Sequence, residues 1–199
     1  MSLQGVIRRS GPDAGGSRES GERELLARVT RGDVDAFERL YRIYEPRLGR
    51  FLATMLQRPQ LVEEVLNDTM LVVWKSADSF RGASKFSTWL FAIAYRKAIK
   101  ARLSWPDPLE DDQLQLRESD DPGADQQMQQ RKLRDALIEA MSHLSPEHRA
   151  VVDLTYFHGL GYREIAEIVS CPVDTVKTRM FHARKRLRQS LPGGFADWI

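Results

Sequence analysis

Apolar residues recur every three or four positions along most of the chain, which is the spacing of one face of an α-helix. Between Glu22 and Pro59 this spacing is interrupted at Gly32-Asp33 and near Pro46, so two or three helices are predicted there. Two further helical segments follow, over 61–80 and 87–103, with a glycine-containing loop between them. No segment shows the period-two alternation of a β-strand, so the pattern predicts an all-α fold.

The C-terminal third repeats the helical signal in shorter pieces. Apolar periodicity resumes at Arg131, and Ser145-Pro146 predicts a serine N-cap followed by proline at the first helical position. Two more helical patterns, Tyr162 to Val169 and Pro172 to Ser190, are separated by only two residues. Two short helices joined by so tight a turn are typical of a helix-turn-helix.

The last of these helices has an apolar stripe and an opposite polar face. The stripe consists of Val173, Val176, Met180, Ala183 and Leu187. Opposite lie Asp174, Thr178, Phe181, His182, Lys185 and Gln189, flanked by Lys177, Arg179, Arg184, Arg186 and Arg188. Flanking cations can reach phosphates while the central side chains meet base edges, so we interpret this helix as a DNA-reading helix in a major groove. A solvated basic helix that complements its own dipole is the alternative.

Charge is distributed unevenly, although the net charge of the 199 residues is only +2. The segment 172–191 carries six Lys and Arg against one Asp, whereas 104–130 carries eight Asp and Glu against one Arg. The acidic segment also holds three prolines and buries little apolar surface, which predicts a flexible linker. The predicted organisation is therefore a disordered tail over 1–21, a helical domain over 22–103, an acidic linker over 104–130, a helix-turn-helix domain over 131–191 and a tail over 192–199.

Composition excludes several classes of protein. The single cysteine, Cys171, rules out an intramolecular disulfide, and no apolar run reaches the length of a bilayer span. We therefore expect a cytoplasmic protein without membrane insertion. The four histidines match no metal-binding spacing, and no nucleophile motif or phosphate loop is present, so neither an enzyme nor a cofactor is predicted.

The stretch 79–100 places aromatic residues beside cations around the glycine-containing loop. Aromatic faces stack unpaired bases and nearby cations hold the backbone, so this combination suits single-stranded nucleic acid. The same residues also have helical spacing, which is typical of a core, and for Trp89 the core interpretation is favoured.

These motifs together resemble the extracytoplasmic-function (group IV) sigma factors of bacteria. The resemblance rests on D-T-M-L-V-V-W-K-S-A-D-S-F-R-G, F-S-T-W-L-F-A-I-A-Y-R-K-A, L-S-P-E-H-R-A-V-V-D-L-T-Y-F-H-G-L-G-Y-R-E-I-A and C-P-V-D-T-V-K-T-R-M-F-H-A-R-K-R-L, in that order around the acidic linker. It covers roughly residues 22–191 and implies a sigma-2-like domain followed by a sigma-4-like domain.

The resemblance implies a role for each surface. Contacts with the promoter −10 element are expected from Phe80, Arg81, Ser84, Lys85, Phe86, Phe91, Arg96, Lys97 and Lys100. Contacts with the −35 element are expected from Asp174, Thr175, Lys177, Thr178, Arg179, Phe181, His182, Arg184 and Lys185. Docking on core RNA polymerase is expected from Asn67, Asp68, Met70, Leu71 and Trp74. The implied partners are the clamp helices of the largest catalytic subunit, the polymerase flap, duplex and single-stranded promoter DNA, and an anti-sigma factor.

A different class of protein also fits part of the pattern. A one-component regulator would use residues 22–103 as a sensory or dimerising domain and would bind paired duplex half-sites without polymerase. The aromatic loop and the acidic linker argue against it.

Overall fold

The computed structural model describes residues 12–104 and 136–191, with side chains from Glu19 onward. Its named helices are α1 (Pro12–Val29), α2 (Val34–Leu56), α3 (Pro59–Ser76), η1 (Ala77–Ser79), α4 (Phe86–Ser104), α6 (Pro146–Tyr156), α7 (Tyr162–Val169) and α8 (Val173–Ser190). Residues 136–142 are also helical. The described ranges contain no strand, so the predicted all-α fold is confirmed. The acidic linker beyond Ser104, residues 1–11 and the tail 192–199 lie outside the described residues.

The first helix begins earlier than the sequence predicted. Residues 12–21 were predicted as part of a disordered tail, but they belong to α1. Leu26 and Val29 anchor the end of α1 in the core, and the helix also contacts η1 and α4. Extending an anchored helix costs far less than starting one, so the polar stretch continues the helix back to Pro12. Proline suits this first turn, where its missing N–H has no helical partner.

The second helix is continuous from Val34 to Leu56. The carboxylate of Asp33 caps it by accepting a hydrogen bond from the Ala36 N–H at 3.0 Å. This bond and a second one from Arg28 lower the pKa of Asp33. Pro46 lies inside α2 instead of near the start of a separate helix. Buried residues on both sides of Pro46 hold the helix together through it, namely Ala36, Leu40, Tyr44, Leu48, Phe51, Leu52, Met55 and Leu56.

The helix-turn-helix has the form that the sequence predicted. α7 has the predicted bounds, and Ser170 ends it in the left-handed conformation with φ 52°. α8 begins at Val173, one residue later than predicted, because Pro172 is extended with ψ 149°. The predicted cap of α6 is also present, since the Ser145 hydroxyl accepts a hydrogen bond from the His148 N–H at 3.4 Å.

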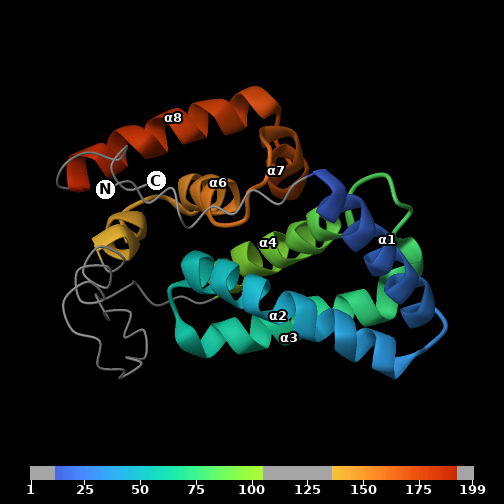
Figure 1. Ribbon diagram of the computed structural model, residues 1–199. Coiled ribbons are helices and arrows are strands. Elements are labelled where there is room, and N and C mark those ends of the chain that lie inside the picture. Colours follow the sequence, from blue (N-terminus) through green and yellow to red (C-terminus); the bar gives the residue numbers. More distant parts are fainter. Residues whose placement is uncertain (1–11, 105–135, 192–199) are drawn as a thin grey trace, which may run out of the picture.

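The helix-turn-helix unit packs directly on the N-terminal helices. α7 lies against α4, and α6 lies against α2, as the arrangement in Figure 1 shows. His158 is buried at this boundary, with its ring centroid 6.1 Å from that of Phe51 and 4.7 Å from that of Phe91. Its Nε2 atom lies 3.1 Å from a carboxylate oxygen of the buried Asp153. One hydrophobic core therefore runs through both predicted domains.

A buried arginine also crosses the boundary. Arg149 of α6 donates a hydrogen bond from Nη1 to the carbonyl oxygen of Thr54 in α2 at 3.1 Å. Its other nitrogens bond the carbonyl oxygens of Met141, Ser142 and Leu144, at 3.0, 2.7 and 2.8 Å. The guanidinium thus caps the end of helix 136–142 and joins it to α2. None of the described helices is long and apolar enough to span a lipid bilayer.

Candidate nucleic-acid interface

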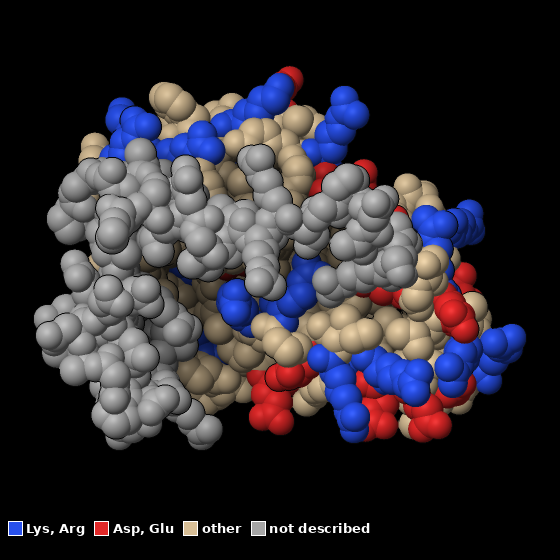
Figure 2. Space-filling model, viewed as in Figure 1, with Lys and Arg blue, Asp and Glu red and all other residues tan. Residues whose placement is uncertain are grey.

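The outward face of α8 carries most of the residues predicted to read duplex DNA. Phe181 is 66% exposed, an unusual position for a large aromatic ring. Also exposed are Asp174, Lys177, Thr178, His182 and Lys185, whereas Thr175, Arg179 and Arg184 are half-buried. Val176, Met180, Ala183 and Leu187 are buried, so the predicted stripe is confirmed except for the half-buried Val173. Figure 2 shows Lys and Arg side chains along the upper edge of the molecule, over α8.

Contacts within the helix-turn-helix unit divide the cations of α8 into two kinds. Lys177 pairs with Asp174 at 2.9 Å, and both side chains are well exposed, so this pair can exchange for a phosphate. Arg184 instead donates from Nε and Nη2 to the Tyr156 hydroxyl at 2.9 and 2.6 Å. That fork fixes α8 on α6. Arg184 therefore holds α8 in place from the side, a role that the sequence did not indicate.

His148 lies beside α8, but it is not among the residues predicted to contact the −35 element. Its ring lies 6.3 Å from that of His182, and its Nδ1 is 2.6 Å from the Ser145 hydroxyl. Burial, followed by the nearby charges of Arg186 and His182, lowers the pKa of His148. The lowered pKa favours the neutral imidazole beside a cationic helix.

The loop between η1 and α4 rests on a cluster of aromatic rings. Phe86 packs its ring against Tyr44 and Phe80, with centroid distances of 5.3 and 5.8 Å. Trp89 joins them, with its ring centroid 5.5 Å from that of Phe80. Phe80 and Trp89 are half-buried, but Phe86 is only 3% exposed. The interpretation of Trp89 as packed against the core is confirmed.

Two of the predicted −10 contacts are core residues instead. Phe91 is fully buried against Phe51 and His158, and Phe86 is buried in the aromatic cluster. An aromatic ring at these positions covers a large apolar area that packing satisfies completely. Neither side chain can stack on a base in this conformation. The half-buried Phe80 is the ring of the loop that remains within reach.

The cations around the loop fall into two groups. Arg81, Arg96 and Lys100 are exposed. Lys97 donates to the Asp68 carboxylate at 2.8 Å, which joins α4 to α3. Lys85 lies 3.1 Å from Glu164 of α7 and 3.7 Å from Glu19 of α1. Its hydrogen bond and charge interaction with Glu164 raise the pKa of Lys85, so the ammonium is charged at neutral pH.

Of the five residues predicted to dock on core RNA polymerase, four are at least partly exposed on α3. Leu71 is 46% exposed, and Trp74 is half-buried with its ring centroid 5.1 Å from that of Phe37. Asn67 accepts a hydrogen bond from the Tyr41 hydroxyl at 3.0 Å. Met70, however, is 1% exposed and belongs to the core, because it lies on the flank of α3 that is buried with Leu66 and Val73. The accessible set is Asn67, Asp68, Leu71 and Trp74, supported by Phe37 and Tyr41.

Phe37, Tyr41, Glu19 and Glu164 are the neighbours that sequence reasoning missed. Phe37 and Tyr41 are four residues apart on one face of α2, a spacing visible in the sequence, but nothing in it indicates that they support α3. The two glutamates give no local signal, because their role depends on the packing of distant helices. Within residues 12–104 and 136–191, no group of three His, Cys, Asp or Glu side chains could hold a metal ion.

Comparison with known proteins adds the following similarities. Residues 40–104 match the family described as Sigma-70 region 2, and residues 134–187 match Sigma-70, region 4. The chain is 30% identical to the ECF RNA polymerase sigma-E factor of Haemophilus influenzae over 182 residues, which are 85% of this chain and 95% of that protein. It is 28% identical over 180 residues to the RNA polymerase sigma-H factor of Pseudomonas aeruginosa, covering 85% and 93% of the two chains.

Two solved structures share the fold. CnrH, in complex with the cytosolic domain of CnrY, aligns with a TM-score of 0.63 at 23% identity, covering 84% of this chain and 94% of CnrH. The sigma factor RpoE of Bartonella quintana, in complex with the anti-sigma factor NepR, aligns with a TM-score of 0.60 at 22% identity, covering 79% and 97%. The family matches fall on the two helical units described above.

Proposed function

Because the chain belongs to the extracytoplasmic-function sigma factors of the sigma-70 family, we propose that it directs core RNA polymerase to specific promoters. In this proposal α8 reads the −35 element as duplex, and the loop before α4 takes part in recognising and melting the −10 element. The protein confers specificity on an enzyme and catalyses no reaction itself.

The observation that carries the proposal is that one chain has two exposed surfaces of different character, each suited to a different form of DNA. α8 offers an exposed aromatic ring and cations on a helix, which suits the major groove of a duplex. The loop offers Phe80 with Arg81, Arg96 and Lys100 around it, which suits an unpaired strand. A regulator that only binds duplex half-sites needs the first surface and has no use for the second.

Melting energetics explain why polymerase is required. Opening about five base-pair steps costs on the order of 7 kcal/mol of stacking, at about 1.4 kcal/mol for each step. One stacked base returns about 1 to 3 kcal/mol, and in this conformation only one loop aromatic, Phe80, is within reach of a base. Core polymerase therefore supplies the larger part of the free energy, through docking on the α3 surface and its own contacts with DNA.

The α3 surface suits a protein partner. Leu71 and Trp74 provide apolar area, while Asn67 and Asp68 provide acceptors beside it. We assign this surface to the clamp helices of the polymerase, and the helix-turn-helix unit to the flap. An anti-sigma factor that covers these faces is the expected inhibitor, by analogy with the relative crystallised with NepR.

In vitro transcription tests the proposal. Purified core RNA polymerase and the full chain would be incubated with a pool of upstream fragments from the source genome. We expect discrete start sites that share two motifs about two helical turns apart, and only when both proteins are present. Tight dimeric binding to duplex half-sites with no transcription would overturn the proposal in favour of the one-component regulator.

Replacing Phe181 by alanine should weaken −35 recognition about fivefold. The exposed ring offers apolar contact to a thymine methyl group, which we value at about 1 kcal/mol. Because the side chain packs on nothing in the core, the free energy of unfolding should hardly change. Titration of holoenzyme on matched promoters measures the effect. Phe157→Ala is the control, since Phe157 is 42% exposed but lies outside α8, and an equal loss in both variants would contradict the assignment.

A further inference from the structure

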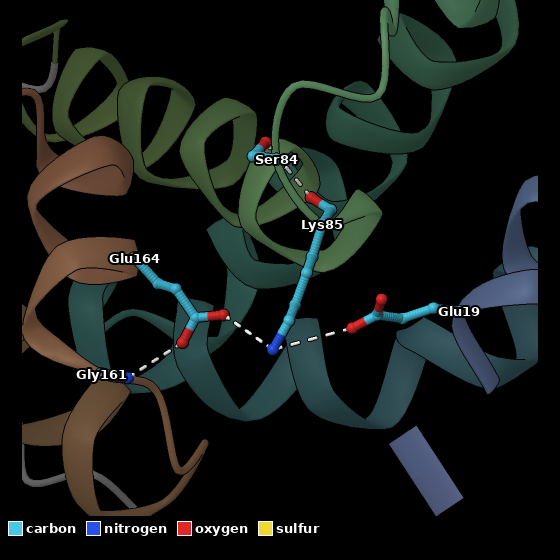
Figure 3. Close-up of polar contacts among 5 residues, drawn as sticks. All are labelled: Glu19, Ser84, Lys85, Gly161 and Glu164. Carbon is cyan, nitrogen blue, oxygen red and sulfur yellow. Dashed lines mark hydrogen bonds and ion pairs between the residues drawn. The ribbon is translucent and has the colours of Figure 1, made fainter. Parts of the chain in front are cut away.

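Lys85 lies where three distant parts of the chain meet. It belongs to the loop before α4, and its ammonium lies between carboxylates of Glu164 in α7 and Glu19 in α1. Figure 3 shows the two carboxylates approaching Nζ from opposite sides. The distances are 3.1 Å to Glu164 and 3.7 Å to Glu19. The same ammonium is one of the predicted −10 contacts.

The stronger of the two partners is fixed in place. One carboxylate oxygen of Glu164 faces Lys85, and the other accepts a hydrogen bond from the Gly161 N–H at 3.0 Å. Gly161 is the N-cap of α7, so this bond is half of a capping box and orients the glutamate at the first turn. A carboxylate held in this way presents its charge to Lys85 much as a phosphate oxygen would.

The described arrangement cannot bind both promoter elements at once. Glu164 places α7 directly against the −10 loop, and α8 packs on α7. The outward face of α8 is therefore separated from the loop by about two helix diameters, roughly 20 to 25 Å, plus at most the length of α8, about 27 Å. Two turns of B-DNA span about 70 Å. The helix-turn-helix unit must therefore leave the N-terminal helices before the chain can engage a promoter, and Lys85 loses Glu164 when it does.

We propose that the described conformation is a self-inhibited form of the free chain, in which the ion pair between Lys85 and Glu164 is an electrostatic latch that closes the helix-turn-helix unit over the −10 loop, while Glu19 holds Lys85 from its own unit. This inference rests on the proposed function for its biological consequence. On opening, the ammonium loses Glu164 and keeps only the longer, solvent-exposed pair with Glu19, which phosphates of the −10 strand can displace. The latch also gives α1, which the sequence predicted to be partly a disordered tail, a place in the mechanism.

The solvent exposure of the paired side chains sets the strength of the latch. The Lys85 side chain is 52% exposed, and those of Glu164 and Glu19 are 26% and 37% exposed. Ion pairs this open to solvent shift an equilibrium by about 1.5-fold to fivefold each. The closed form is also held by the ring contacts of His158 with Phe51 and Phe91 and by the packing of α7 on α4 and α6 on α2. A weak latch on a larger apolar interface is easily opened by a competing polyanion or by polymerase.

Glutamine substitutions in the full chain isolate the charge. In Glu164→Gln the amide oxygen can still accept the Gly161 hydrogen bond, so the capping box is kept while the charge is lost. Glu167→Gln is its matched control, because Glu167 is exposed on the same helix. Glu19→Gln is matched in the same way by Glu24→Gln on α1. Each control removes one negative charge from the chain, as its test variant does, but at a side chain that is not paired with Lys85.

Two readouts distinguish the latch from the proposed function. The closed fraction is measured by single-molecule fluorescence transfer between Cys171, the one native cysteine, and a second label at Glu64→Cys on α3. Affinity of the free chain is measured for a single-stranded −10 oligonucleotide taken from a promoter found by transcription. We expect Glu164→Gln to raise the open-to-closed ratio and the oligonucleotide affinity up to fivefold over Glu167→Gln. Glu19→Gln should not raise the open-to-closed ratio, because Glu19 lies in the same unit as Lys85 and only competes with Glu164 for it.

Salt provides an internal check, because exposed ion pairs are screened. Raising the ionic strength should open the parent chain, but should change the closed fraction of the Glu164→Gln variant much less. Equal closed fractions in Glu164→Gln and Glu167→Gln would overturn the latch, even if transcription proceeds normally. Opening by Glu164→Gln in a chain that never supports transcription would uphold the latch and overturn the proposed function instead.

Discussion

Replacing Arg149 by leucine should lower the free energy of unfolding by about 3 to 5 kcal/mol, the largest effect on stability expected of any single substitution described for this chain. The side chain is 2% exposed and donates to four carbonyl oxygens, three of them at the end of helix 136–142. Leucine fills part of the volume but donates nothing. Buried acceptors without donors then bear the full cost of desolvation.

The charge of Arg149 is part of the argument. Burial, with a smaller contribution from Arg102, lowers the pKa of Arg149 to about 10. The guanidinium is therefore still charged at pH 7, and it lies where the carbonyl dipoles of a helix C-terminus favour a cation. Its fourth hydrogen bond, to Thr54, is also one of the contacts between the two units. The substitution should consequently open the closed form as well as destabilise the helix-turn-helix unit.

Urea denaturation of the full chain measures the loss for Arg149→Leu. Arg163→Leu, at an exposed position of α7, is the control and should change the free energy of unfolding by less than about 0.5 kcal/mol. Arg149→Lys should fall between the two, because an ammonium keeps the charge but cannot reach all four carbonyls. If Arg149→Leu is as stable as Arg163→Leu, the buried guanidinium is not the organising group that its contacts indicate.

Helices were predicted well from the sequence wherever local signals agreed. α7 has its predicted bounds, and α6 has its predicted serine cap, because capping chemistry and apolar spacing are properties of neighbouring residues. The start of α1 was not predicted. Residues 12–21 have no apolar periodicity, and their helix depends on the anchored turns that follow and on contacts with η1 and α4. Tertiary contacts of that kind leave no local pattern.

The same difference between local signals and tertiary contacts decides which residues of the candidate site could be predicted. The outward face of α8 could be predicted because its buried stripe is periodic. Phe86, Phe91 and Met70 were assigned to surfaces by their place in a motif, but a motif does not say which side of a helix another helix covers. The meeting of Phe51, His158 and Phe91 joins residues on either side of the linker, and nothing in the neighbours of His158 indicates it.

The largest functional effect is expected from Leu71→Glu, which should weaken binding of core RNA polymerase by about 2 kcal/mol, or roughly 30-fold. Leu71 is 46% exposed on α3 and forms the apolar part of the proposed docking surface with Trp74. A glutamate there would have to be desolvated on docking, beside the existing carboxylate of Asp68. Because Leu71 is not a core residue, the fold and the free energy of unfolding should be preserved.

The exposed Ile43 provides the matched control for this prediction. It is 39% exposed on α2, beside Arg39 and Arg42 and next to α1, so Ile43→Glu makes the same chemical change away from the docking surface. Polymerase affinity is measured by fluorescence titration with labelled chain, and transcription is measured on a matched promoter. Leu71→Glu should lose both polymerase affinity and transcription, while Ile43→Glu keeps both.

Equal losses in the two variants would mean that added negative charge weakens polymerase binding wherever it is placed. An unchanged Leu71→Glu would mean that the exposed leucine on α3 meets some other partner, and the docking surface would have to be sought on another face of the N-terminal helices.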